Sequence, residues 1–145
     1  MPKVQADGLP LPQRYCAILT IVIGISMAVL DGAIANVALP TIATDLHATP
    51  ASSIWVVNAY QIAIVISLLS FSFLGDMFGY RRIYKCGLVV FLLSSLFCAL
   101  SDSLQMLTLA RVIQGFGGAA LMSVNTALIR LIYPQRFLGR GMGIN

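Results

Sequence analysis

The chain has 145 residues, of which 59% are hydrophobic and only 10% are charged, and its mean hydropathy is +0.90. Soluble domains carry about 25% charged residues, so this composition cannot cover a water-facing surface, and most of the protein is expected to face lipid. The formal net charge of +4 is too sparse for a nucleic-acid-binding face, so we expect no nucleic-acid partner.

Four apolar segments are long enough to cross a bilayer as helices, which takes about 20 residues each. In chain order they cover about 15–40, 53–75, 83–101 and 104–132. Residues 1–14 are expected to be a cytoplasmic tail, and the pattern that starts near 138 to be the stump of a fifth helix. The sequence therefore predicts an all-α, polytopic membrane protein whose N-terminal bundle is incomplete, and we interpret the chain as an N-terminal fragment.

Basic residues gather at alternate ends of these spans. Two precede the first span, three lie around the second connection and three lie at or beyond the end of the fourth span, whereas the other two connections have none. Because cytoplasmic segments of membrane proteins are enriched in Lys and Arg, the N-terminus is predicted to be cytoplasmic. The expected location is the cytoplasmic (inner) membrane.

Two charged residues, Asp31 and Arg111, lie inside predicted spans away from the span ends, and at similar depths. Each is costly in hydrocarbon unless it is paired, hydrated or neutralised. One interpretation is a fixed ion pair that locks the first span to the fourth. The interpretation that we favour is a titratable carboxylate in a water-filled cavity, with Arg111 acting on it.

Polar and small residues accompany the two charges. Asn58, Gln61 and Gln114 are candidates to line a cavity or bind substrate, although Asn58 and Gln61 are equally explained as polar contacts between helices. Small residues share a stripe of the first span with Asp31: Gly24, Ala28, Ala35 and Ala38. A second set on the fourth span, Gly115, Gly117 and Gly118, is expected to serve helix packing and not to bind phosphate.

The chain has few of the residue types that form catalytic or metal-binding sites. The chain has one His, no Glu and three Cys without ligand spacing. We therefore expect no enzyme activity, no metal and no cofactor.

Four segments resemble the N-terminal part of the major facilitator superfamily, in particular its fourteen-span drug:proton antiporter branch. Residues 30–40, LDGAIANVALP, resemble the signature LDxTIVNVALP, and 55–60, WVVNAY, resemble WVVTAY. Residues 75–82, GDMFGYRR, are similar to the loop motif GxLADRxGRR, with Met77 and Tyr80 at basic positions. The fourth span matches LxxxRxxQGxG through Leu107, Arg111, Gln114, Gly115 and Gly117.

The resemblance implies roles for two sets of residues. Arg111 is implicated in proton coupling, and the loop motif implies a conformational latch. Its residues here are Asp76, which is expected to end the second helix, Gly79, which permits the reversal, and the cations Arg81 and Arg82. The alternative for the two arginines is simple positive-inside anchoring.

These observations lead to one functional hypothesis and two alternatives. We expect a proton-coupled secondary transporter that exports hydrophobic or cationic drugs by alternating access, with Asp31 as the proton or cation acceptor. Its partners would be the bilayer, protons, lipophilic or cationic small molecules, and the remaining spans of the carrier. The alternatives are a proton-coupled metabolite transporter of the same superfamily and a four-span scaffold without transport.

Overall fold

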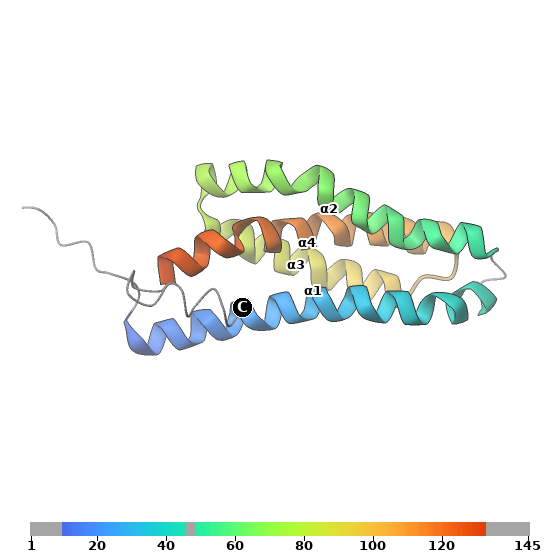
Figure 1. Cartoon of the computed structure of the whole chain (residues 1–145), viewed down its shortest axis with the longest axis horizontal. Helices are drawn as coiled ribbons and strands as arrows, with labels where there is room; N and C mark the ends of the chain where they lie inside the picture. Colours follow the sequence, from blue (N-terminus) through green and yellow to red (C-terminus); the bar gives the residue numbers. More distant parts are fainter. Residues whose placement is uncertain (1–9, 46–48, 133–145) are drawn as a thin grey trace, which may run out of the picture.

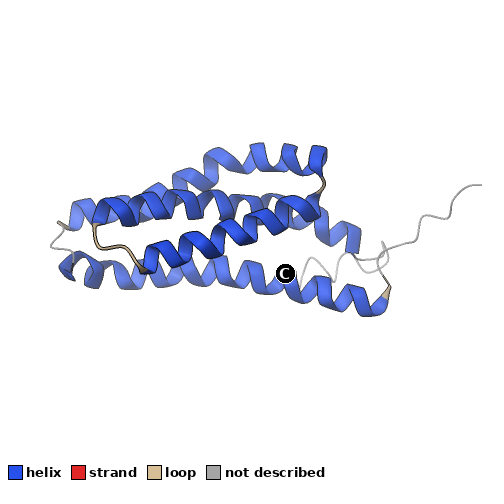
Figure 2. Cartoon of the chain, turned by 180° about the vertical axis from the view of Figure 1, so that it is seen from behind, coloured by secondary structure: helices blue, strands red, loops and turns tan. Residues whose placement is uncertain are grey.

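The computed structural model describes residues 10–45 and 49–132, and within them every regular element is a helix (Figure 2). The helices are α1 (Leu11–Asp45), α2 (Pro50–Phe78), α3 (Tyr80–Ala99) and α4 (Leu104–Ile132). Each contains a stretch that is long and apolar enough to cross a membrane. The all-α membrane fold predicted from the sequence is confirmed, while the expected start of a fifth helix near 138 lies outside the described residues.

Helix boundaries differ from the sequence expectation where local chemistry, not hydropathy, sets them. The predicted tail is shortened because α1 already begins at Leu11. At the start of α2, Thr49 caps the helix: its Oγ1 accepts a hydrogen bond from the backbone N–H of Ser52 at 3.2 Å, and Pro50 occupies the first turn.

The turn between α2 and α3 consists of a single residue, Gly79. Its φ of +92° is a conformation that side chains rarely permit, and its N–H donates to the carbonyl of Gly75 at 3.0 Å. The expectation that Asp76 ends the second helix is wrong, because α2 continues to Phe78 and Gly79 makes the reversal.

The four helices run along the long axis of the molecule with alternating direction (Figure 1). The start of α1, the end of α2, the start of α3 and the end of α4 therefore lie at one end of the bundle. That end carries Arg14, Arg81, Arg82, Lys85 and Arg130 on the described helices. The alternating direction of the helices thus brings the basic residues to the same end of the bundle, as their positions in the sequence predict.

Helix α4 is the centre of the bundle, since it packs extensively against both α2 and α3, whereas α1 makes fewer contacts. Two glycines of α4 allow these close approaches. A Cβ on Gly115 would lie 2.7 Å from the Cβ of Ala63 in α2, and one on Gly117 would lie 2.7 Å from the backbone N of Phe91 in α3. Small residues thus let the helix backbones meet, as in many membrane bundles.

The outer faces of the bundle carry large apolar side chains, including Val37 on α1 and Leu69 on α2, which are about four-fifths exposed. Toward the bundle interior, α1 presents the stripe of small residues predicted from its spacing, with Gly24, Ala28 and Ala35 buried. The Tyr84 hydroxyl of α3 donates to the carbonyl of Thr20 at 3.1 Å and ties α3 to α1. The stripe thereby directs Asp31 toward the other helices.

Candidate functional site

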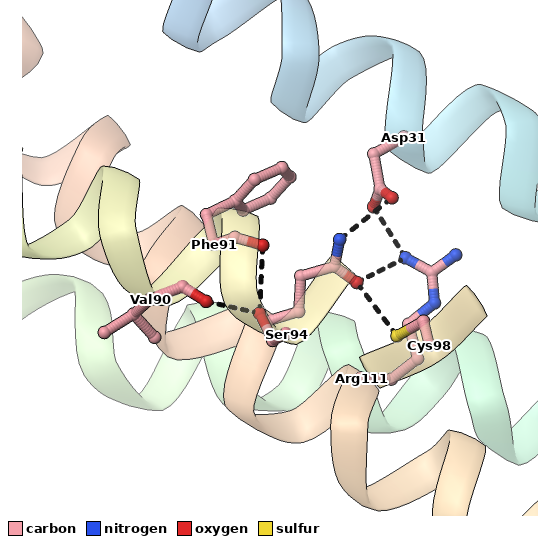
Figure 3. Close-up of polar contacts among 7 residues, drawn as sticks. Asp31, Val90, Phe91, Ser94, Cys98 and Arg111 are labelled. Carbon is pink, nitrogen blue, oxygen red and sulfur yellow. Dashed lines mark hydrogen bonds and ion pairs between the residues drawn. The ribbon is translucent and has the colours of Figure 1, made fainter. Parts of the chain in front are cut away.

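Asp31 and Arg111, 80 residues apart in sequence, form an ion pair between α1 and α4 (Figure 3). The Nη1 atom of Arg111 donates to Oδ2 of Asp31 at 2.6 Å. The side chains are 18% exposed for Asp31 and 9% exposed for Arg111. The structure thus brings together the two charges that the sequence places at similar depth, and each compensates the other within the apolar bundle.

Gln114 completes the network from a fully buried position on α4. Its Nε2 donates to Oδ1 of Asp31 at 2.9 Å, and its Oε1 accepts from Nη1 of Arg111 at 3.0 Å. The thiol of Cys98 on α3 donates to the same Oε1 at 3.5 Å. Both oxygens of the Asp31 carboxylate therefore have a partner, and three helices contribute to one polar cluster.

The spacing of residues along α4 explains this geometry. Arg111 and Gln114 are three residues apart, so they share one face of the helix, and that face points at α1. On α1, Asp31 stands in the sequence between the buried Ala28 and Ala35, whose small side chains leave the neighbouring helices free to approach.

A recess of about 190 Å³ adjoins the cluster between α1, α2 and α4; we call it the α1–α2–α4 recess. Its lining residues are Ala28, Val29, Gly32, Ala35, Asn36, Val57, Tyr60, Gln61, Ile64, Arg111 and Met122. Of the two polar residues predicted on the second span, Gln61 lines the recess, whereas Asn58 is exposed and is not among its lining residues. The pair is therefore not brought together in one cavity.

Tyr60 is a member of the site that reasoning from individual residues did not single out. The Arg111 guanidinium carbon lies 5.6 Å from the centre of its ring, within the range of a cation–π interaction. Tyr60 is buried, and its hydroxyl has no hydrogen-bond partner among the described residues. The only sequence signal for it was its place in the segment WVVNAY, where an aromatic residue in an apolar run looks like a lipid contact.

The residues of the expected latch lie at the end of the bundle that carries the basic side chains (Figure 1). Asp76 accepts a hydrogen bond from the hydroxyl of Tyr80, which stands where the family motif has a basic residue. Arg81 and Arg82 are exposed, and neither forms an ion pair with Asp76 in the described part of the chain. Within these four helices the loop is thus held by a phenol and by Gly79, not by its arginines.

Metal-binding geometry is not found in 10–45 and 49–132, where no group of three or more His, Cys, Asp or Glu side chains comes together. The polar chemistry of the described site consists of one carboxylate, one guanidinium, one amide, one thiol and one phenol. Such a set can form hydrogen bonds, and its carboxylate is the group that could accept a proton.

Four membrane-length helices that enclose a hydrogen-bonded charge pair define a polytopic membrane protein with a polar cluster in its core. Residues 21–145 match the family model described as Major Facilitator Superfamily, and the chain belongs to this superfamily. This membership supports transport and not an enzyme reaction.

Three relatives illustrate the range of named functions. The chain is 99% identical over all of its 145 residues to an uncharacterized transporter, YebQ, of Escherichia coli K12. It is 34% identical over 92% of its length to the riboflavin transporter RibZ of Clostridioides difficile, and 39% identical over 79% of its length to the putative multidrug resistance protein MdtD of Salmonella paratyphi B. It spans 32%, 29% and 24% of these proteins, respectively, so it corresponds to less than a third of each.

Proposed function

We propose that the complete protein exports hydrophobic or cationic compounds across the cytoplasmic membrane in exchange for protons, with Asp31 as the group that takes up the proton. The observation that carries this proposal is the double attachment of the Asp31 carboxylate to Arg111 and Gln114 beside a recess in the membrane core. A similarity to the protein named putative multidrug resistance protein MdtD supports export of drugs.

Proton coupling follows from what protonation does to this contact. A proton on Asp31 removes the charge that holds the Arg111 guanidinium, so the link between α1 and α4 weakens. A conformation that hydrates the carboxylate favours proton exchange, whereas one that encloses it favours either the ion pair or the neutral acid. Because the two protonation states prefer different conformations, a proton gradient can drive alternating access.

Antiport requires that substrate and proton compete. A cationic compound that approaches the ionised Asp31 and displaces Arg111 would be released when a proton neutralises the carboxylate. Arg111 would hold the carboxylate between these events, and Gln114 would keep it in position. The alternative of a fixed ion pair predicts instead that the contact persists through the transport cycle.

A second candidate is proton-coupled transport of a metabolite, which is favoured by the 34% identity to the protein named riboflavin transporter RibZ. Such a substrate would need directional polar contacts in addition to an apolar pocket. A scaffold without transport has no support, since the chain belongs to a transporter superfamily.

The orientation and the latch are parts of the same proposal. The end of the bundle with Arg14, Arg81, Arg82 and Arg130 faces the cytoplasm, because basic residues are retained on that side. Asp76, Gly79 and the two neighbouring arginines would form contacts there with spans of the complete carrier in one of its conformations.

The test is proton-driven efflux by the complete protein with Asp31→Asn, which removes the titratable group and keeps the size of the side chain. In everted membrane vesicles with an acidic interior, we expect ethidium accumulation to fall to background, whereas Asp102→Asn, a change in an exposed turn, should leave it intact. Unchanged accumulation with Asp31→Asn would refute the assignment.

A further inference from the structure

The thiol of Cys98 connects α3 to the polar cluster around Asp31. It donates a hydrogen bond to Oε1 of Gln114 at 3.5 Å (Figure 3). Ser94, one turn earlier on α3, is engaged elsewhere, because its hydroxyl donates to backbone carbonyls of its own helix. Of these two polar side chains of α3, Cys98 is therefore the one that acts on the Asp31 site.

The amide of Gln114 has an oxygen end and a nitrogen end, and its neighbours distinguish between them. Two donors face Oε1, namely Nη1 of Arg111 at 3.0 Å and the Cys98 thiol, while Oδ1 of Asp31 lies 2.9 Å from Nε2. Gln114 is fully buried, so water does not replace these partners. If the amide were turned by 180°, its N–H groups would meet two donors and its oxygen would meet a carboxylate oxygen. An ionised Asp31 therefore leaves the amide one favourable orientation.

Proton uptake at Asp31 weakens two of these three constraints. The neutral carboxyl group gains an O–H donor, and it no longer holds the Arg111 guanidinium by charge. A Gln114 amide turned by 180° could then accept this O–H through Oε1. Such a hydrogen bond would stabilise the neutral acid, because a contact made only by the neutral form disfavours ionisation. The Cys98 thiol opposes this rotation, since it needs the amide oxygen where it lies now.

The titratable and charged groups at the cluster come from all four helices: Asp31 from α1, Tyr60 from α2, Cys98 from α3 and Arg111 from α4. The Tyr60 ring lies against the guanidinium, with its centre 5.6 Å from Cζ of Arg111, and its hydroxyl has no hydrogen-bond partner in the described part of the chain. Tyr60 therefore does not orient the amide. Within 10–45 and 49–132, the Cys98 thiol is the donor to the amide oxygen that carries no charge of its own.

We propose that Cys98 is a positioning residue of the proton site: its thiol keeps the Gln114 amide turned with Nε2 toward Asp31 while Asp31 is neutral, and so favours release of the proton. This inference rests on the proposed function and deepens it, since Cys98 acts on proton release through Gln114 alone. When the proton leaves Asp31 for water, the amide is already oriented to donate to the carboxylate. Without the thiol, a turned amide would accept the O–H of Asp31 and retain the proton.

The experiment follows the ionisation of Asp31 by infrared difference spectroscopy of the complete purified protein in detergent, over a series of pH values. The carbonyl band of the neutral carboxyl group is assigned to Asp31 by its loss in Asp31→Asn. In Cys98→Ala, we expect the pH at which half of Asp31 is ionised to rise by about half a unit to one unit, the effect of one hydrogen bond. Cys98→Ser restores a donor and should keep the wild-type midpoint.

Cys86→Ala is the matched control, because Cys86 is an exposed cysteine of the same helix. It should leave the midpoint unchanged. Cys98→Val fills the space of the thiol without supplying a donor, so it should shift the midpoint like Cys98→Ala and replaces that variant if alanine prevents folding. A purely structural role of Cys98 would lower the melting temperature and leave the midpoint where it is. The proposal is wrong if the variants without a donor titrate at the wild-type pH, or if Cys98→Ser shifts as far as they do.

The titration separates this inference from the proposed function. A raised midpoint in Cys98→Ala, together with no proton-driven efflux by wild type, would refute export and leave the role of Cys98 intact. Efflux that depends on Asp31, together with equal midpoints, would refute the role of Cys98 alone. A wild-type Asp31 that does not titrate would refute both.

Discussion

The side chains of Gln114 and Asp31 are joined across 83 residues of sequence, with the amide nitrogen 2.9 Å from the carboxylate oxygen Oδ1. The same amide accepts a hydrogen bond from Arg111 through its oxygen. Gln114 therefore satisfies both members of the ion pair at once. The Gln114 amide is therefore a positioning group, and its removal would leave Oδ1 of Asp31 and Nη1 of Arg111 each with one hydrogen bond fewer.

Gln114→Leu keeps the approximate volume of this buried side chain and removes its hydrogen bonds to both charged residues, together with the one from Cys98. We expect the complete protein to lose about 2–3 kcal/mol of stability, because charged partners are left underbonded in an apolar environment. The measurement is thermal unfolding in detergent. Gln105→Leu, at an exposed position near the start of the same helix, should change stability by less than about 0.5 kcal/mol. Equal effects from the two variants would contradict the role of Gln114.

Arg111→Lys retains the positive charge and loses the planar guanidinium that reaches Asp31 and Gln114 together. We expect proton-driven ethidium efflux to fall by about tenfold or more, as one charge-assisted hydrogen bond is worth about 1.5–3 kcal/mol. The assay is the same as for Asp31→Asn. Arg130→Lys, which changes an exposed arginine of the same helix, is the control and should transport normally. Full activity of Arg111→Lys would mean that charge alone suffices.

Gly117→Ala places a methyl group 2.7 Å from the backbone N and 2.9 Å from the Cα of Phe91. Because backbone atoms cannot move aside as a side chain does, α3 and α4 must separate. We expect lower thermal stability, with a cost of about 1–3 kcal/mol, as for other overpacked cores. A Cβ on Gly32 meets nothing within 4 Å in the described residues, so Gly32→Ala should not destabilise the protein. If Gly32→Ala melted at a lower temperature than Gly117→Ala, the close contact between α3 and α4 at Gly117 would be wrong.

Gly79→Ala introduces a side chain at a φ of +92° in the only residue between α2 and α3. The strained backbone should cost about 1–3 kcal/mol. Thermal unfolding of the complete protein measures it, with Met77→Ala, an exposed position in the preceding turn, for comparison. If Gly79→Ala is no less stable than Met77→Ala, the turn does not depend on glycine.

Topology can be tested with reporters that are active on one side of the membrane only. Alkaline phosphatase fused after Asp102 should be active, because this turn is predicted to lie outside the cytoplasm, whereas the same enzyme fused after Arg82 should be inactive. Green fluorescent protein at the two sites should give the opposite pattern. A cytoplasmic reporter after Asp102 would overturn the orientation.

The sequence is sufficient for the helices and for placing the two buried charges at similar depth, while it leaves open whether they form an ion pair. Long apolar runs can hardly be anything but spanning helices, and equal depth on two spans already suggested that Asp31 and Arg111 could meet. The residue spacing also placed Gln114 on the same face as Arg111. What each of these residues does remains part of the proposal.

Other features depended on how each helix is rotated about its axis, which hydropathy does not determine in a membrane. Asn58 and Gln61 are one turn apart, yet only Gln61 lines the recess. Tyr60 reads as one more apolar residue, and its contact with Arg111 comes from the packing of α2 against α4. The prediction that α2 ends at Asp76 is wrong because an acidic residue does not by itself stop a helix, whereas the backbone conformation of Gly79 makes the turn.

The hydrogen bond between Tyr84 and Thr20 has a mechanical consequence for α1. Thr20 and Asp31 are two points at which side-chain hydrogen bonds join this helix to α3 and α4, and they lie about 16 Å apart along its axis. The Asp31 attachment depends on charge and the Thr20 attachment does not. If the carboxylate is neutralised, α1 keeps its attachment to α3 at Thr20 and loses the ionic one to α4. The C-terminal half of α1 could then rotate away from α4 about Thr20.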